Sequence, residues 1–182
     1  MSRIVRAAAL VTLVLSLMVG LSACGSDEAD SAGEWADSVC SSIGDWRAEV
    51  QATVDGFRDD PASISADSLR EATDDTVEST EALVDELRDL GPPETDSGEE
   101  ARAEIDELAD SLESSRDSVE ETLEGSSESV SGVVANLSAI TAELQAAATA
   151  ASATFERLLA LDPGGELEQA FSEEDSCTAL RE

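Results

Sequence analysis

Apolar side chains recur every three or four positions along most of the chain, and short segments containing Gly and Pro interrupt them. This spacing places the apolar residues on one side of an α-helix, because an α-helix completes a turn in 3.6 residues. The pattern predicts an all-α fold with four long helices and a short C-terminal one, at about residues 34–57, 63–90, 96–123, 129–160 and 166–171. Short connections between long amphipathic helices favour an antiparallel bundle.

The first two predicted helices carry the clearest apolar stripes. In the first, the stripe contains both tryptophans of the chain: Trp35, Val39, Ile43, Trp46, Val50, Val54 and Phe57. We expect these tryptophans to pack in the core rather than to bind a ligand. In the second, the positions step by four and three as in a heptad seam with threonines in the middle: Leu69, Thr73, Thr76, Thr80, Leu83, Leu87 and Leu90.

The fourth predicted helix differs from the others because it is almost uncharged. From Val130 to Phe155 the one charged residue is Glu143. A helix without a charged face is normally buried on several sides, so we expect this helix to be the central element of the bundle. The alternative is that one of its faces is uncovered and contacts a protein or an apolar ligand.

The chain as a whole is strongly acidic. Asp and Glu number 42 against 10 arginines, with no lysine or histidine, and the formal net charge is -32. Such a surface repels nucleic acids and anionic lipid headgroups. Three arginines, Arg70, Arg102 and Arg116, each have an acid three residues before and four residues after them. This spacing stabilises a solvated helix and does not indicate a site.

The composition excludes most of the common combinations of catalytic residues. Without His or Lys the chain has no Ser-His, Cys-His or Ser-Lys pair, and no P-loop or dinucleotide motif is present. We expect no enzyme, no cofactor and no metal site. Two less favoured alternatives remain, an enzyme that uses paired carboxylates and a protein that binds cations through its many acids.

The N-terminal residues are typical of a secretory signal. Arg3 and Arg6 precede an apolar run from Ala7 to about Leu21, which is short for a membrane span. The alternative is a signal anchor that stays uncleaved. The residues that follow, Leu21-Ser22-Ala23-Cys24, resemble the lipobox of bacterial lipoproteins.

The resemblance implies a lipid anchor and a cleavage site. In lipoproteins a diacylglyceryl group is attached to the thiol of the cysteine that corresponds to Cys24, and the chain is cut before it, here after Ala23. Buried acyl chains contribute about 0.8 kcal/mol per CH₂ to membrane binding. The expected organisation is therefore a signal peptide at 1–23, a lipidated acidic tether at 24–33 and a helical domain at 34–182 on the extracytoplasmic face of a membrane.

The cysteine count agrees with this interpretation. The chain has three cysteines, and lipidation of Cys24 leaves Cys40 and Cys177 as a pair. In an oxidising compartment we expect them to form a disulfide that closes the bundle. Two unpaired buried thiols are the alternative.

The layout also resembles uncharacterised helical lipoproteins of actinobacteria, on two segments. These are Glu34–Cys40, with a Trp and a Cys in the first helix, and Ala170–Cys177 near the C-terminus. The resemblance implies no established activity. We expect a non-catalytic binding module of the cell envelope, whose partner is the membrane through Cys24 and an envelope protein or apolar ligand. The alternative is an acidic structural spacer without a specific ligand.

Overall fold

The computed structural model describes residues 27–59, 64–124 and 129–181, and all regular secondary structure in these ranges is helical. The predicted signal peptide, the segment Leu21–Cys24 and the first tether residues lie outside the described residues. The helices are α1 (Asp27–Asp59), α2 (Ala66–Asp89), α3 (Gly98–Glu124), α4 (Val130–Leu161), α5 (Glu166–Glu173) and α6 (Asp175–Ala179). The predicted all-α class is confirmed.

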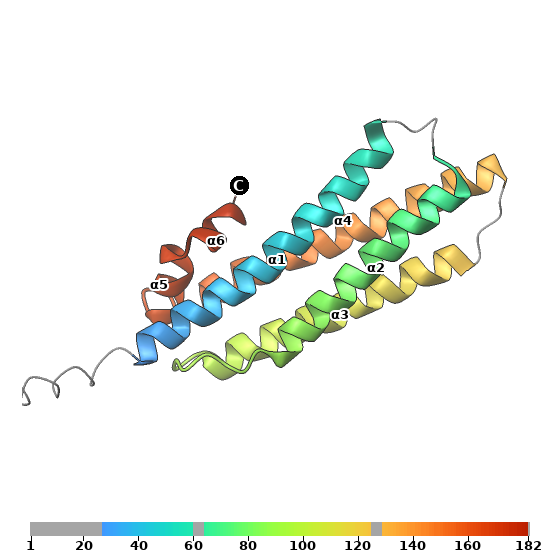
Figure 1. Cartoon of the computed structure of the whole chain (residues 1–182). Coiled ribbons are helices and arrows are strands. Elements are labelled where there is room, and N and C mark those ends of the chain that lie inside the picture. Colours follow the sequence, from blue (N-terminus) through green and yellow to red (C-terminus); the bar gives the residue numbers. More distant parts are fainter. Residues whose placement is uncertain (1–26, 60–63, 125–128, 182) are drawn as a thin grey trace, which may run out of the picture.

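The four long helices form an elongated antiparallel bundle (Figure 1). Neighbours in sequence pack side by side, most closely α3 with α4 and α2 with α3. The short helices α5 and α6 fold back onto α1 at one end, where α5 also contacts α4. The sequence pattern predicted one short C-terminal helix, and the structure has two, because Glu174 ends α5 in an extended conformation and serves as the N-cap residue of α6.

The start of α1 corrects a predicted boundary. We expected residues up to 33 to form a flexible tether, but α1 already begins at Asp27. Ala32, with 1% of its surface exposed, is buried next to the stripe that Trp35 and Ala36 continue. A small alanine suffices to extend the buried side of the helix by a turn, and alanine has the highest helix propensity.

Local contacts shape the starts of α2 and α3. At α2, Ser65 and Ser68 form a reciprocal capping box: each side-chain oxygen accepts a hydrogen bond from the backbone N–H of the other, at 3.1 and 2.9 Å. At the start of α3, a Cβ atom on Gly98 would lie 2.1 Å from the carbonyl oxygen of Pro93. Only glycine allows this close approach of the two backbone segments.

The core follows the predicted stripes. All seven stripe residues of α1 are buried, and so are Leu69, Leu83 and Leu87 of α2. The buried threonines of α2 satisfy their hydroxyls locally: Thr73 donates to the carbonyl of Leu69 at 2.7 Å. Hydrogen-bonded hydroxyls are tolerated in a core, whereas unpaired ones are costly.

Candidate interaction surface

Helix α4 has a buried side and an exposed side, and this corrects the expectation that it is surrounded by the bundle. Its buried residues lie on one stripe: Ile140, Leu144, Ala147, Ala151, Thr154, Phe155 and Leu158. The helix packs along α3, and its contacts with α1 and α2 are sparse. Ala, Ser and Thr side chains bury little apolar surface, so leaving them exposed costs little free energy. The fold is therefore stable without another helix that covers this side of α4.

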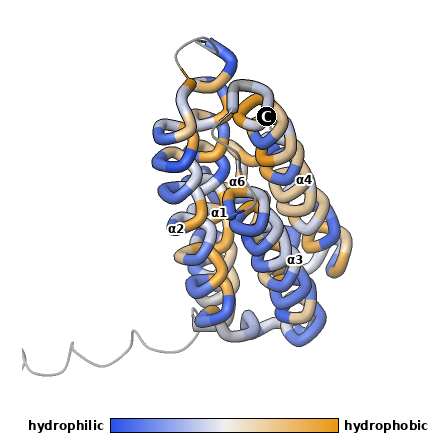
Figure 2. The backbone as a smooth tube through the Cα atoms, turned by 90° about the vertical axis from the view of Figure 1, so that its right-hand side faces the viewer, coloured by the Kyte–Doolittle hydropathy of each residue, from blue (hydrophilic) through white to orange (hydrophobic). Residues whose placement is uncertain are grey.

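The opposite side of α4 is exposed and carries no charge. We call it the uncharged face, and its residues are Ser131, Val134, Ala135, Ser138, Ala139, Ala142, Gln145, Ala146, Thr149, Ser152 and Ala153. The one charged residue of this stretch, Glu143, is partly buried and lies at the edge of the face, four residues after Ala139. In Figure 2, α4 is tan along most of its length, whereas blue hydrophilic bands recur along α2 and α3.

Small residues form a regular stripe within the uncharged face. Successive members are separated by four, three, four, three and four residues: Ala135, Ala139, Ala142, Ala146, Thr149 and Ala153. All six are exposed. This is the spacing of a heptad seam, and in coiled coils such a seam packs against another helix. The sequence alone contained this spacing, but we did not single it out because small uncharged residues occupy most positions of the helix.

A large apolar side chain is also exposed on this face. Val134 has 61% of its surface exposed and is the exposed large hydrophobic residue of the described chain. None of the residues 131–139 is buried, although Val133 and Leu137 pack partly against the core. The N-terminal third of α4 is therefore the least covered part of the helix.

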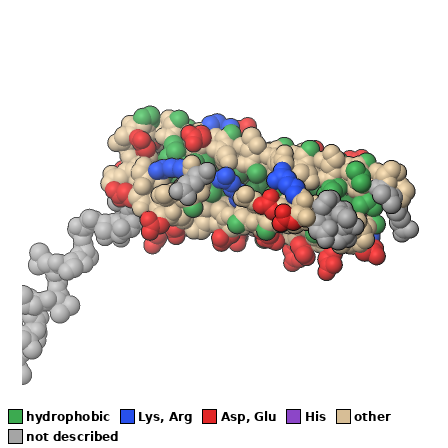
Figure 3. Space-filling model, turned by 90° about the horizontal axis from the view of Figure 1, so that it is seen from above, with side chains coloured by type: hydrophobic (Ala, Val, Ile, Leu, Met, Phe, Trp, Pro, Cys, Tyr) green, Lys and Arg blue, Asp and Glu red, His purple; other side chains and the backbone are tan. Residues whose placement is uncertain are grey.

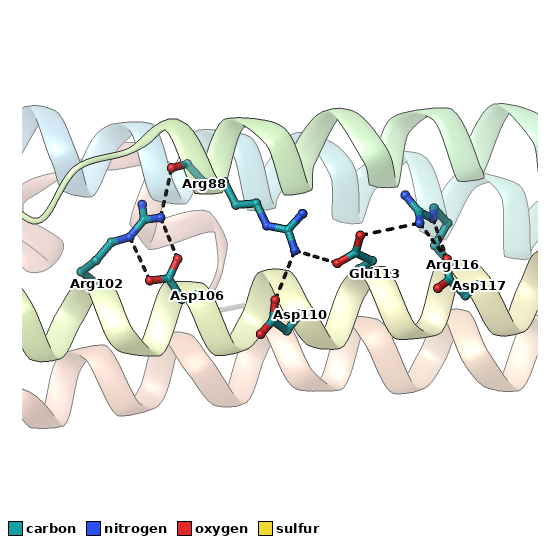
Figure 4. A network of polar contacts seen from close by, with 7 residues as sticks. All are labelled: Arg88, Arg102, Asp106, Asp110, Glu113, Arg116 and Asp117. Carbon is teal, nitrogen blue, oxygen red and sulfur yellow. Dashed lines mark hydrogen bonds and ion pairs between the residues drawn. The ribbon is translucent and has the colours of Figure 1, made fainter.

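The helices on the other side of the bundle present acids and ion pairs. On the face shown in Figure 3, acidic side chains gather along the edges of the molecule. Between α2 and α3, Arg88 contacts Glu113 at 2.6 Å and Asp110 at 3.2 Å (Figure 4). The hydrogen bond that Arg88 donates to Glu113, followed by the one it donates to Asp110, raises the pKa of Arg88 above its ordinary value. These are exposed pairs, and each contributes little to stability.

Arg102 has a role that the sequence did not reveal. It pairs with Asp106 at 2.6 Å, as the spacing suggested, and its guanidinium also reaches the C-terminal end of α2. There it donates hydrogen bonds of 3.0 Å to the carbonyls of Leu87 and Arg88, and another to the carbonyl of Leu90. These carbonyls have no partner within their own helix, so Arg102 caps α2.

The predicted cysteine pair forms a disulfide. The sulfur atoms of Cys40 and Cys177 are 1.99 Å apart, their Cα atoms are 4.9 Å apart, and both residues are fully buried. The bond fastens α6 to α1. Next to it, the ring of Phe171 packs edge-on against those of Trp35 and Phe155, with centroids 5.9 and 5.6 Å away. This aromatic cluster joins α1, α4 and α5.

Two open cavities lie near the short helices. One of about 510 Å³ lies between α1 and α6 and is lined by residues that include Ser41, Asp45, Arg47 and Leu180. The other, of about 420 Å³, is lined by residues that include Glu34, Glu166, Glu173 and Glu174. Within the described residues, no three metal-ligating side chains are close enough together to hold a metal ion.

In residues 27–59, 64–124 and 129–181 no helix combines the length and the apolar character needed to cross a membrane. No family model, no curated protein and no solved structure matches this chain.

Proposed function

We propose that this protein is a lipid-anchored, extracytoplasmic, non-catalytic module that docks a partner through the uncharged face of α4. The observation that carries the proposal is the contrast between this exposed, charge-free face of small side chains, with Val134 on it, and the acidic surface of the other helices. Exposed apolar surface that a monomer does not cover is typical of a contact site.

Anchoring rests on the lipobox-like segment and on the cysteine count. Once Cys24 is lipidated, Cys40 and Cys177 remain, and these two are joined to each other. Helix α1 begins at Asp27, and the chain between Cys24 and Asp27 spans at most about 11 Å. The folded domain would therefore stand directly at the bilayer, where a neighbouring envelope protein is within reach.

The anchoring part of the proposal is tested by the intact mass of the full chain after extraction from membranes. We expect a mature chain that starts at Cys24, carries acyl groups and contains one disulfide. The variant Cys24→Ser should lose the lipid and fail to be processed. Normal maturation of Cys24→Ser with retention on the membrane would contradict the anchor.

The docking part is tested by photo-crosslinking of the full chain in its native membrane. A photoreactive residue at Ala139, on the uncharged face, should give a discrete adduct, and one at Glu107, an exposed residue of α3, should not. The adduct from position 139 should disappear when Ala146→Arg places a charge about two helical turns further along the same stripe. Equal labelling at positions 139 and 107, or an adduct that persists with Ala146→Arg, would argue instead for a spacer without a docking site.

A further inference from the structure

We infer that the cavity between α1 and α6 binds a small zwitterion that carries one carboxylate and one ammonium group, such as an amino acid or a short peptide. The cavity takes no residue from α4, so the inference does not depend on the docking proposal. Its volume of about 510 Å³ lies within the usual range of small-molecule sites, which is about 300 to 1,000 Å³.

Arg47 is the positive group of this cavity. Acids outnumber arginines 42 to 10 in the chain, yet Arg47 forms no ion pair within the described residues. The positions three and four residues before and after it on α1 hold no acid. Of its five N–H donors, one donates to the carbonyl of Leu180 at 3.3 Å. The remaining donors can form the paired hydrogen bonds with which a guanidinium binds a carboxylate.

Asp45 is the negative group and lies at the opposite edge of the cavity. At about 100° per residue, the α1 residues that line the cavity span about 160° of the helix surface, from Arg47 at one edge to Asp45 at the other. Asp45 is exposed and has no hydrogen bond or ion pair with the described part of the chain. The small residues Gly44 and Ala48 lie between the two charges and leave room for a ligand.

The wall formed by α6 is held in place covalently. Cys177 of α6 is joined to Cys40, which itself lines the cavity, so the disulfide fixes α6 against α1. Ser41 and Gln51 add a hydroxyl and an amide that can bond the polar groups of a ligand. A cavity whose walls are already fixed lowers the entropy cost of binding.

The charge of the chain decides between classes of ligand. At a formal net charge of -32 the surface repels anions, and it attracts cations to the many carboxylates outside the cavity. A zwitterion has no net charge and can pair with Arg47 and Asp45 at once. A cavity with one residue of each sign therefore matches a zwitterion better than an ion of either sign.

Isothermal titration calorimetry of the detergent-extracted full chain tests the inference. The probes are glycine, diglycine and triglycine, which carry the same two charges at increasing distance. At least one of them should bind saturably. Its N-acetylated and its C-amidated forms, each of which lacks one charge, should bind more weakly. If no probe binds saturably, or if either modified form binds as tightly as the unmodified probe, the inference is overturned.

Two variants locate the site. Arg47→Met and Asp45→Asn should each weaken binding of the best probe roughly five- to tenfold, because each removes a charge-assisted hydrogen bond. Arg58→Met is the control, because Arg58 forms an exposed ion pair further along α1, and it should leave the affinity unchanged. Asp45→Asn removes no contact of the described structure, so it remains informative if Arg47→Met unfolds. Unchanged affinity in either folded variant would contradict the inference.

Discussion

Trp46 of α1 donates an indole hydrogen bond of 2.9 Å to the hydroxyl of Thr80 on α2. That hydroxyl donates in turn to the carbonyl of Thr76 at 2.7 Å, and all three residues are buried. The threonines in the middle of the α2 seam therefore provide a buried hydrogen-bond acceptor for the indole N–H of Trp46. Both the indole N–H and the Thr80 hydroxyl have partners.

Replacing Thr80 by Val should destabilise the bundle. The substitution keeps the shape of the side chain and removes the acceptor of the Trp46 indole, and a buried donor without a partner costs about 1 to 3 kcal/mol. Urea unfolding should show this loss. Thr80→Ser, which retains the hydroxyl, should recover much of the hydrogen-bond contribution, and equal effects of the two variants would show that the contact is unimportant.

The disulfide should be a major contributor to stability. It joins residues 137 positions apart, and the chain-entropy model assigns such a loop about 5 kcal/mol. Cys40→Ala with Cys177→Ala should lower the free energy of unfolding by up to this amount, measured with urea. Reducing agent should destabilise the parent chain similarly and should leave the double variant unchanged.

Arg102→Met should cost more than the loss of an ordinary surface ion pair. It removes the hydrogen bonds to the C-terminal carbonyls of α2, and hydrogen bonds to a charged group contribute about 1.5 to 3 kcal/mol. Arg70→Met is the matched control, because Arg70 pairs with Asp67, whose side chain is 97% exposed, and such pairs contribute about 0 to 1 kcal/mol. Similar thermal midpoints for the two variants would contradict the capping role.

Two glycines of helical segments should respond in opposite ways to alanine. At Gly98 the added Cβ would lie 2.1 Å from the Pro93 oxygen, so Gly98→Ala should destabilise the α2–α3 connection. At Gly56 no atom lies within 4 Å of the added Cβ, so Gly56→Ala should stabilise α1 by about 0.5 to 1 kcal/mol. Thermal unfolding of both variants checks the signs.

Hydrophobic periodicity predicted the parts of the fold in which large side chains alternate with charged ones. The stripe of α1 was predicted residue by residue, and that of α2 as far as Leu87, because burial of Trp, Leu and Val dominates their packing. Leu90, the last predicted position, is the C-cap residue of α2 and is only partly buried. Hydrophobic periodicity placed the start of α1 too late, because alanine alone marks the buried side there. It also predicted one short helix after residue 165 where the structure has two.

The candidate site was harder to predict for the same physical reason. In α4 the large side chains Ile140, Leu144 and Phe155 lie on the buried side. The other side has small uncharged residues, and the lack of charge led us to expect that this side is covered too. The cap formed by Arg102 depends on a contact between α3 and the end of α2, which no spacing within one helix encodes.

The central claim is that a partner covers the uncharged face of α4, and the most direct measurement is the rate at which a maleimide labels Ala142→Cys. In intact membranes labelling should be slow compared with Glu107→Cys, and it should become as fast as at that control when Ala146→Arg is added. Equally fast labelling of both positions in membranes without Ala146→Arg would show an uncovered face and contradict the account.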